Sequence, residues 1–286
     1  MEGLKEGILL SQYSTFRIGG PAKYLIKVSN IEDLKRAIQK AIDLDLKFLV
    51  IGGGSNILFS SKGFDGVVIV FNSIDKLLIN DTLIEVSAST PLNYLVSSLK
   101  NYTGLEWAVG IPGTLAGAIN GNAGAYKEEI SSLIKQVEVL EIKDKKIQIK
   151  KYSKKECNFS YRSSVFKNNS NLIIISAILE LKRGEEKEIN KKIKENLKKR
   201  ILKQPRGFSI GSIFKNGDNF SAGELIEKAG LKGMKIGDAK ISEEHANFII
   251  NLGKATSDDV LELIKIIKKE VKQKFLIELE EEIKIF

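Results

Sequence analysis

The chain has 286 residues, 43% of them hydrophobic and 28% charged, so it is long enough for two or three domains and too apolar to be a disordered chain. One cysteine and one histidine exclude an intramolecular disulfide and a Cys/His metal cluster, so no metal site is expected. The net charge of +9 leaves a nucleic-acid-binding function open. Cys157 is interpreted as a small, semi-buried strand residue and not as a nucleophile.

The first elements expected along the chain form a small β-α-β unit. Residues 23–28 and 47–51 have strand patterns, and residues 32–43 between them place their apolar side chains on one helix face. The second strand runs into the loop Gly52-Gly-Gly-Ser-Asn56, and consecutive glycines after a strand are typical of a loop whose main-chain N–H groups hold an anion. A dinucleotide fingerprint is excluded because Ile57 follows where a third glycine and a helix would be needed, and no P-loop lysine is present.

Residues 66–181 are expected to form a larger α+β portion. A helix beginning near Pro91 and the glycine-rich run, residues 104–126, interrupt five predicted strands at 67–71, 83–89, 136–142, 146–151 and 172–181. The glycine-rich run holds six glycines three to six positions apart among small apolar residues. Glycine is kept where φ is positive or where a ligand approaches the main chain too closely for a Cβ. Two such segments in one chain indicate a long anionic cofactor held mainly by main-chain groups.

The basic charge is concentrated in one predicted helix. Residues 182–203 contain ten Lys or Arg against four Glu, which accounts for +6 of the net charge. Ile189, Ile193, Leu197 and Ile201 recur every four residues, which predicts an apolar stripe with a solvated, lysine-rich back. No aromatic residue lies between the charges to stack on a base, so a solvated helix face is favoured over a nucleic-acid site.

A third unit is expected after the break at Pro205. Residues 204–286 alternate strand and helix patterns. Ser221 and Glu224 have the spacing of a capping box at the start of one helix, and Asp258 lies near the start of the last one, where an acidic side chain suits the helix dipole. This portion is therefore predicted to fold by packing helices on its own small sheet.

Seven short motifs follow one another along nearly the whole chain, at residues 14–22, 52–56, 111–126, 161–166, 211–216, 245–251 and 279–283. In this order they resemble the motifs of the UDP-N-acetylenolpyruvoylglucosamine reductase (MurB) family. The resemblance implies an α+β fold, with a two-part FAD-binding module of the vanillyl-alcohol-oxidase type and a C-terminal α/β substrate domain. The corresponding segments are 1–65, 66–203 and 204–286. No extra segment lies between Arg162 and Gln204, which places the chain in the shorter subfamily without a tyrosine-bearing lid.

The resemblance also implies an activity. A cytoplasmic, NADPH-dependent flavoenzyme would reduce UDP-N-acetyl-3-O-(1-carboxyvinyl)-glucosamine to UDP-N-acetylmuramate in peptidoglycan synthesis, and so serve cell-wall biogenesis, cell shape and division. FAD is the implied cofactor, NADPH the co-substrate and a small nucleotide sugar the partner. The protein is expected to be a monomer, with no nucleic-acid or membrane partner. Two alternatives stay open: an FAD oxidase of the same fold acting on another substrate, and a basic nucleic-acid-binding protein with vestigial glycine loops.

The same resemblance assigns three catalytic residues. Arg162 matches the arginine that stabilises the charge developing on the substrate carboxylate, a role that suits a guanidinium. Ser212 matches the serine that protonates the substrate carbon, and Glu282 matches a glutamate that polarises the enolpyruvyl group. In a strand, alternate residues share a face, so Glu280 is expected on the side of Glu282 and Glu281 is expected to be solvated. The usual proline before the glutamate is Glu281 here, so a register shifted by one residue also stays open.

Cofactor and substrate contacts follow from the same motifs. The FAD pyrophosphate is expected on the loop 52–56 and the flavin ring beside residues 111–126, with contacts from Gly52, Gly53, Gly54, Ser55, Asn56, Ile111, Pro112, Gly113, Thr114, Asn122, Gly124 and Ala125. The substrate is expected to contact Tyr161, Lys215, Asn216 and His245. For His245 a purely structural role is an equal alternative, because a lone histidine is often a satisfied structural residue.

Overall fold

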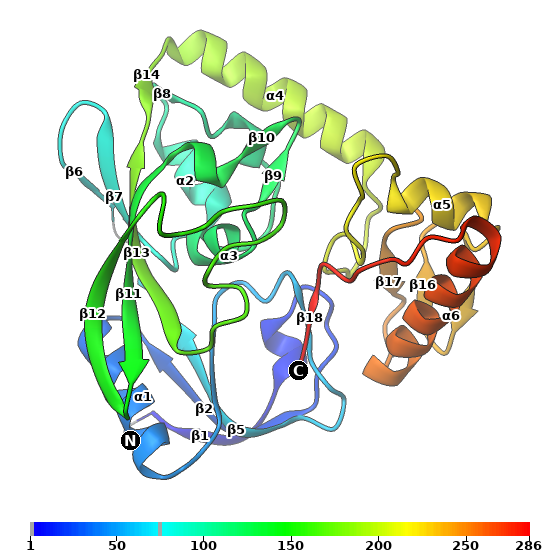
Figure 1. Cartoon of the computed structure of the whole chain (residues 1–286), viewed down its shortest axis with the longest axis horizontal. Coiled ribbons are helices and arrows are strands. Elements are labelled where there is room, and N and C mark those ends of the chain that lie inside the picture. The colour runs from blue at the N-terminus through cyan, green and yellow to red at the C-terminus, as the bar shows by residue number, and fades with distance from the viewer. Residues whose placement is uncertain (1–2, 74–75) are drawn as a thin grey trace. The chain divides into compact units, whose positions relative to one another are not determined.

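The computed structural model describes residues 3–73 and 76–286, which form two compact units (Figure 1). The first unit comprises residues 3–5, 25–53 and 66–200, and the second comprises residues 6–24, 54–65 and 201–286. The chain passes between the units inside strands β2 (Pro21–Val28) and β5 (Phe64–Phe71). Both units are therefore discontinuous in sequence, and the division into the three segments 1–65, 66–203 and 204–286 stays a prediction.

A five-stranded antiparallel sheet forms the centre of the first unit. Its order is β12-β11-β13-β7-β6, with bounds Lys146–Ser153, Ile134–Lys143, Leu172–Glu180, Leu83–Ser87 and Lys76–Leu78. Strand β13 lies between two partners and is buried along most of its length, with Ala177 opposite both Val137 and Val86. The edge strand β12 is lysine-rich and largely exposed, as is common for a strand that must not pair further. Four of these strands lie close to where the sequence pattern predicts strands, and β6 is not predicted. The fifth predicted strand, 67–71, corresponds to β5 and belongs to a different sheet, together with β2.

The predicted β-α-β unit is confirmed, and its two strands belong to a sheet with two further strands, β1 (Lys5–Leu9) and β5. Helix α1 (Ile31–Asp43) follows β2 and begins after Asn30, whose side chain accepts a hydrogen bond from the Asp33 N–H at 2.8 Å. Strand β3 (Phe48–Ile51) then pairs in parallel with β5, so the sheet order is β1-β2-β5-β3. No crossover helix follows β3, in agreement with the excluded dinucleotide fold. The next element is the short strand β4 (Ile57–Leu58).

Several short elements and one long helix complete the first unit, although the last residues of this helix lie beyond the unit's boundary at Arg200. They are α2 (Leu92–Ser98), β8 (Tyr102–Thr103), the 3₁₀ turn Glu106–Ala108, α3 (Leu115–Asn120), β9 (Gly124–Ala125), β10 (Glu128–Glu129), the 3₁₀ turn Ile130–Ser132, β14 (Lys182–Arg183) and α4 (Glu186–Lys203). Helix α4 corrects the predicted apolar stripe, because Ile189 is buried but Leu197 and Ile201 are 37% and 57% exposed. Its C-terminal half forms hydrogen bonds to the unit through the Arg200 side chain and the Asn196 carbonyl.

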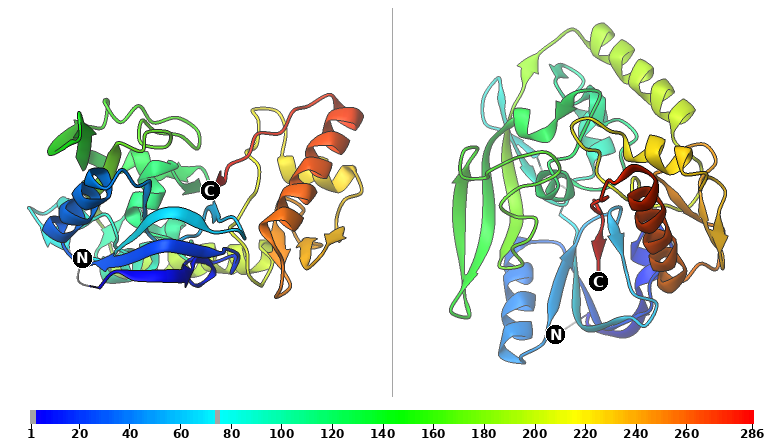
Figure 2. Two further views of the ribbon diagram at one scale, coloured as in Figure 1. Left: turned by 90° about the horizontal axis from the view of Figure 1, so that it is seen from below. Right: turned by 45° about the vertical axis from the view of Figure 1, so that its right-hand side comes forward.

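The second unit packs two helices on a small sheet. Helices α5 (Ala222–Lys228) and α6 (Ser257–Phe275) accompany the antiparallel strands β15 (Lys235–Ile236), β16 (Ala239–Ile241) and β17 (Ile249–Asn251), as Figure 2 shows. Helix α6 has a complete capping box of Thr256 and Asp259, while Ser221 caps α5 by accepting from the Glu224 N–H.

The core of the second unit includes residues from the first 60 positions of the chain. Phe16, Ile18 and Leu58 lie in one hydrophobic cluster with apolar residues between 210 and 283. The 3₁₀ turn Leu10–Tyr13 and the C-terminal strand β18 (Lys284–Ile285), parallel to β4, also belong to this unit. Among the helices of residues 3–73 and 76–286, none has an apolar stretch long enough to cross a bilayer.

Candidate active site

The loop after β3 lies directly against the glycine-rich run. A Cβ added to Gly53 would come within 2.7 Å of the Gly113 Cα atom, and one added to Gly52 within 2.5 Å of the Thr114 Oγ1 atom. Both glycines are nevertheless exposed. Glycine is therefore needed at both positions because the two loops pack closely against each other, before any ligand is considered. A ligand would meet the outer side of a pair of loops that is already closely packed.

Gly117 is different, because nothing in the protein occupies the space of its missing side chain. It is exposed on α3, and a Cβ there would have its nearest neighbour at 3.8 Å. The first N–H groups of α3 are already bonded: those of Leu115 and Ala116 donate to carbonyls of residues 88–90, and that of Gly117 donates to the Thr114 Oγ1 atom. An anion is thus not expected at this helix start, whereas a flat group could lie over the bare surface at Gly117.

Arg162 lies at the tip of a tight turn. Ser160 and Ser163 exchange two main-chain hydrogen bonds of 3.1 Å, which leaves Tyr161 and Arg162 as the two residues of the turn. Arg162 has a φ of +52°, an uncommon value for a residue other than glycine. Its guanidinium carbon lies 5.0 Å from the centre of the Tyr161 ring. The backbone is thus bent so that both side chains project from the same turn.

This turn is attached to the glycine-rich run. The Arg162 Nη2 atom donates to the Gly124 carbonyl at 2.9 Å, and Nη1 to the Asn122 carbonyl at 3.5 Å. The Asn122 side chain is fully buried, donates to the Ser160 carbonyl at 2.9 Å and accepts from the Ser131 N–H at 3.2 Å. Because the Gly124 and Asn122 carbonyl groups are neutral, they orient the guanidinium without neutralising its positive charge. The structure thus brings the predicted catalytic arginine to two predicted cofactor-binding residues, Asn122 and Gly124, of a different motif.

Ser212 and Glu282, in the second unit, lie on neighbouring segments. The Glu282 N–H donates to the Ile213 carbonyl at 2.8 Å, and the Lys215 N–H donates to the Glu280 carbonyl at 2.9 Å. These bonds pair residues 213–215 antiparallel with residues 280–282, while Ser212 itself forms a bridge with Phe248. The Asn56 side chain donates to the Glu282 carbonyl at 3.2 Å, so one residue of the glycine loop also holds this segment.

Asn247, to which the sequence analysis assigned no role, positions the segment that carries Ser212. Its buried side-chain amide accepts from the Phe214 N–H at 2.9 Å and donates to the Phe214 carbonyl at 2.8 Å, and its own carbonyl accepts from the Ile213 N–H. It thereby fixes the segment that begins with Ser212. The sequence signal is an amide inside the apolar string 246–250, since a buried amide needs hydrogen-bond partners.

The glutamates near the C-terminus are not arranged as predicted. Glu281 is not solvated: its side chain is 28% exposed and pairs with Lys268 of α6 at 2.9 Å. The Glu280 side chain is 73% exposed and pairs with Lys215. Strand alternation fails here because only the single pair Phe214 and Glu281 forms a bridge, and a lysine from α6 reaches the segment. Whether Glu282 is the catalytic glutamate stays a prediction.

The remaining predicted substrate contacts have structural partners in the second unit. The Asn216 side chain accepts from the Ala222 N–H at 2.9 Å, at the start of α5. The His245 Nδ1 atom accepts from the Asn247 N–H at 3.3 Å, and its ring packs on Phe248 with centres 4.8 Å apart. Burial, and to a smaller extent nearby Lys232, lowers the pKa of His245 below its ordinary value. These contacts support the structural alternative for His245, while contact with substrate stays a prediction.

His245 should make the second unit sensitive to acid. Because its pKa is lower in the folded than in the unfolded chain, its contribution to stability is complete above about pH 6.5 and is lost as the pH falls through that value towards the folded pKa. Urea unfolding at pH 7.5 and 5.5 should show a larger loss of stability for the wild type than for His245→Asn, whose Oδ1 keeps an acceptor that does not titrate. Equal losses in the two proteins would contradict this.

Cys157 lies in a turn and not in the predicted strand. It is fully buried, and burial together with nearby Glu156 raises the pKa of its thiol to about 12. A thiol of that pKa is protonated at neutral pH and is a poor nucleophile. The structural interpretation of Cys157 is therefore supported.

Comparison with known proteins extends the resemblance to the whole chain. Residues 22–148 match the FAD binding domain family, and residues 203–286 match the UDP-N-acetylenolpyruvoylglucosamine reductase, C-terminal domain family. Similar relatives named UDP-N-acetylenolpyruvoylglucosamine reductase occur in Caldanaerobacter subterraneus subsp. tengcongensis, 43% identical over 99% of this chain and 95% of the relative, and in Clostridium novyi, 37% identical over 99% and 92%.

A solved structure is similar over its full length. The UDP-N-acetylenolpyruvylglucosamine reductase (MurB) of Thermus caldophilus superposes with a TM-score of 0.83 at 35% identity, covering 99% of both chains. Together with the FAD-binding match, this confirms the predicted α+β fold with a two-part FAD-binding module followed by a substrate domain. The shared sequence and fold over nearly every residue place this chain in the UDP-N-acetylenolpyruvoylglucosamine reductase family.

Proposed function

We propose that this chain is an NADPH-dependent flavoenzyme that reduces UDP-N-acetyl-3-O-(1-carboxyvinyl)-glucosamine to UDP-N-acetylmuramate in peptidoglycan biosynthesis. Membership of the reductase family over 99% of the chain supports the reaction. The structural observation that carries it is the attachment of Arg162 to the carbonyls of the glycine-rich run. A fixed positive charge next to the expected cofactor surface supports a role of Arg162 in holding the substrate carboxylate.

The residues of the first unit fit FAD. Gly52 and Gly53 are exposed at the end of β3, and Gly117 presents a bare main-chain surface that no protein atom fills. We assign the pyrophosphate to the loop 52–56, since the first N–H groups of α3 already have partners, and the ring to the surface around residues 111–126. FAD, when bound, supplies a two-electron carrier between NADPH and the vinyl group of the substrate.

The side chains have separate tasks in this proposal. Arg162 binds the substrate carboxylate and stabilises the charge that collects beside it after hydride reaches the terminal vinyl carbon. Ser212 gives its hydroxyl proton to the carbon that bears the carboxylate, and Glu282 polarises the enolpyruvyl group. Tyr161, Lys215, Asn216 and His245 are proposed to contact the nucleotide sugar.

Anaerobic turnover tests the function. The purified protein should be yellow, and it should oxidise NADPH only when the enolpyruvyl nucleotide sugar is added, with one UDP-N-acetylmuramate formed for each NADPH. An oxidase acting on another substrate would instead leave the enolpyruvyl sugar unchanged and require oxygen. A colourless protein that does not take up FAD would refute the flavoenzyme.

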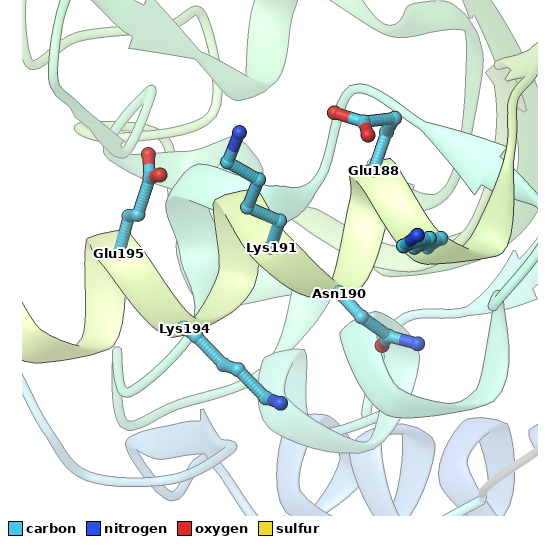
Figure 3. A pocket seen from close by; sticks show the side chains of 6 residues that line it. Glu188, Asn190, Lys191, Lys194 and Glu195 are labelled. Atoms are coloured by element: carbon cyan, nitrogen blue, oxygen red, sulfur yellow. The ribbon is translucent and has the colours of Figure 1, made fainter.

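The basic helix α4 is proposed to have no nucleic-acid or membrane partner, and the protein is proposed to act as a cytoplasmic monomer. The open hollow on α4 in Figure 3 supports this: it is lined by residues of this helix, with Asn190 and Lys194 pointing to one side and Glu188, Lys191 and Glu195 to the other. Side chains that diverge into solvent are typical of a solvated helix face.

Charge reversal on α4 should therefore have little effect. Lys191, Lys194 and Lys198 are exposed, so replacing all three by Glu should leave turnover within a few-fold at physiological salt, where the screening length is about 8 Å. Steady-state kinetics and a DNA and RNA binding assay over a salt series check this. Tight, salt-sensitive nucleic-acid binding by the wild type that the triple variant loses would contradict it.

A further inference from the structure

Helix α4 contacts both ends of the glycine-rich run. The Arg200 Nε atom donates to the Val109 carbonyl at 2.9 Å, and Nη2 donates to the Trp107 carbonyl at 3.3 Å. At the other end of the run, the Tyr126 hydroxyl donates to the carbonyl of Asn196, one turn earlier on α4, at 3.1 Å. In Figure 1, α4 passes alongside β10 and alongside β9, the strand near the end of this run. One helix turn thus connects residues that lie 17 to 19 positions apart in the run.

Arg200 fills the space between these ends. Its guanidinium carbon lies 5.8 Å from the centre of the Tyr126 ring. A Cβ on Gly110 would come within 2.9 Å of the Arg200 Cδ atom, so the arginine packs directly over this glycine, whose φ of +74° also favours glycine. Burial lowers the pKa of Arg200, but a guanidinium remains charged at any physiological pH. The sequence pattern predicts Arg200 in the solvated basic face of the helix, but in the structure its side chain packs against the rest of the first unit.

We propose that Arg200 is a positioning residue that holds the glycine-rich run in its cofactor-binding conformation by tying the start of the run to its end. A segment with six glycines loses much conformational entropy when it is ordered, and a ligand that has to order it binds more weakly. The two bonds to carbonyls and the contact with Tyr126 order the run before FAD arrives. The inference rests on the proposed flavin binding and adds a residue that does not itself touch the flavin.

Flavin titration of Arg200 variants tests the inference. Arg200→Met should weaken FAD binding by about 10- to 100-fold, the effect of losing hydrogen bonds from a charged donor. The FAD affinity of Arg200→Lys should lie between those of Arg200→Met and the wild type, because a lysine reaches one carbonyl at a time. Lys199→Met is the matched control: Lys199 faces the same Tyr126 ring at 5.7 Å but is exposed, and its variant should stay within about twofold. Hydrogen exchange of the main-chain amides in residues 107–126 should be faster in flavin-free Arg200→Met than in the flavin-free wild type.

The outcomes separate this inference from the proposed function. Wild-type affinity in Arg200→Met with unchanged exchange in residues 107–126 would overturn the positioning role alone, and so would acceleration spread evenly over the whole unit. If Arg200→Met does not fold, Arg200→Lys carries the test alone: wild-type FAD affinity together with unchanged exchange in residues 107–126 of that variant would overturn the role as well. A wild-type protein that binds no FAD would refute both.

Discussion

Replacing Ser212 by alanine is expected to slow the reoxidation of reduced flavin by the enolpyruvyl substrate by about 10²–10⁴-fold, the usual contribution of a positioned general acid. Reduction by NADPH should keep the wild-type rate, because hydride transfer to the flavin needs no proton from this hydroxyl. The neighbouring Ile213 is fixed through its main chain by Asn247 and Glu282, so the substitution should leave the segment in place. Stopped-flow absorbance of the flavin separates the two half-reactions.

Ser209→Ala is the matched control for this experiment. Ser209 lies three residues earlier on the same segment and accepts a hydrogen bond from the Thr15 hydroxyl at 2.7 Å through its main-chain carbonyl, which alanine retains. Both of its half-reactions should match the wild type. If Ser212→Ala were also reoxidised at the wild-type rate, Ser212 would have no part in proton transfer.

Gly53→Val is expected to weaken FAD binding by about 10- to 100-fold, which corresponds to ~1–3 kcal/mol of overpacking. The added Cβ would lie 2.7 Å from the Gly113 Cα atom, and a main-chain atom cannot move aside as a flexible side chain can. The substitution should therefore force the loop 52–56 away from the glycine-rich run. The ratio of flavin to protein absorbance after purification measures the loss, and the melting temperature of the flavin-free protein should fall as well.

Gly117→Ala separates ligand approach from protein packing. Its Cβ has room in the structure, and alanine is a better helix former than glycine by ~0.5–1 kcal/mol, so the flavin-free protein should melt at a higher temperature. FAD should nevertheless bind more weakly if it covers this face of α3. A Gly117→Ala protein with wild-type FAD affinity would falsify the placement of the cofactor on this surface, whatever Gly53→Val shows.

The sequence predicts much of the local structure correctly because local structure depends on nearby residues. Helix α1 and strand β11 follow from apolar periodicity, and the start of α6 is signalled by its acidic residues. The apolar stripe of α4 was predicted wrongly beyond Ile189, since periodicity shows which side chains share a face but not what covers that face. Family motifs carried the prediction of the fold and the reaction, and the comparisons confirm both.

The candidate site was only partly predictable. The motifs name Arg162, Asn122 and Gly124, but nothing in the sequence states that the guanidinium donates to the other two carbonyls. The ion pair of Glu281 with Lys268 was missed because strand alternation was applied to a segment that forms a single bridge.

By itself, then, the sequence determined the family, the glycine-rich segments and the longer helices and strands, since each is encoded by neighbouring residues or by short ordered motifs. Only the tertiary structure decided that Phe16 and Leu58 belong to the core of the C-terminal unit, that Asn247 holds the Ser212 segment, and that Arg200 is packed against the glycine-rich run. The physical reason is the same in each case. These contacts join residues tens to hundreds of positions apart, and a buried amide or guanidinium takes whichever partners the packed chain presents to it.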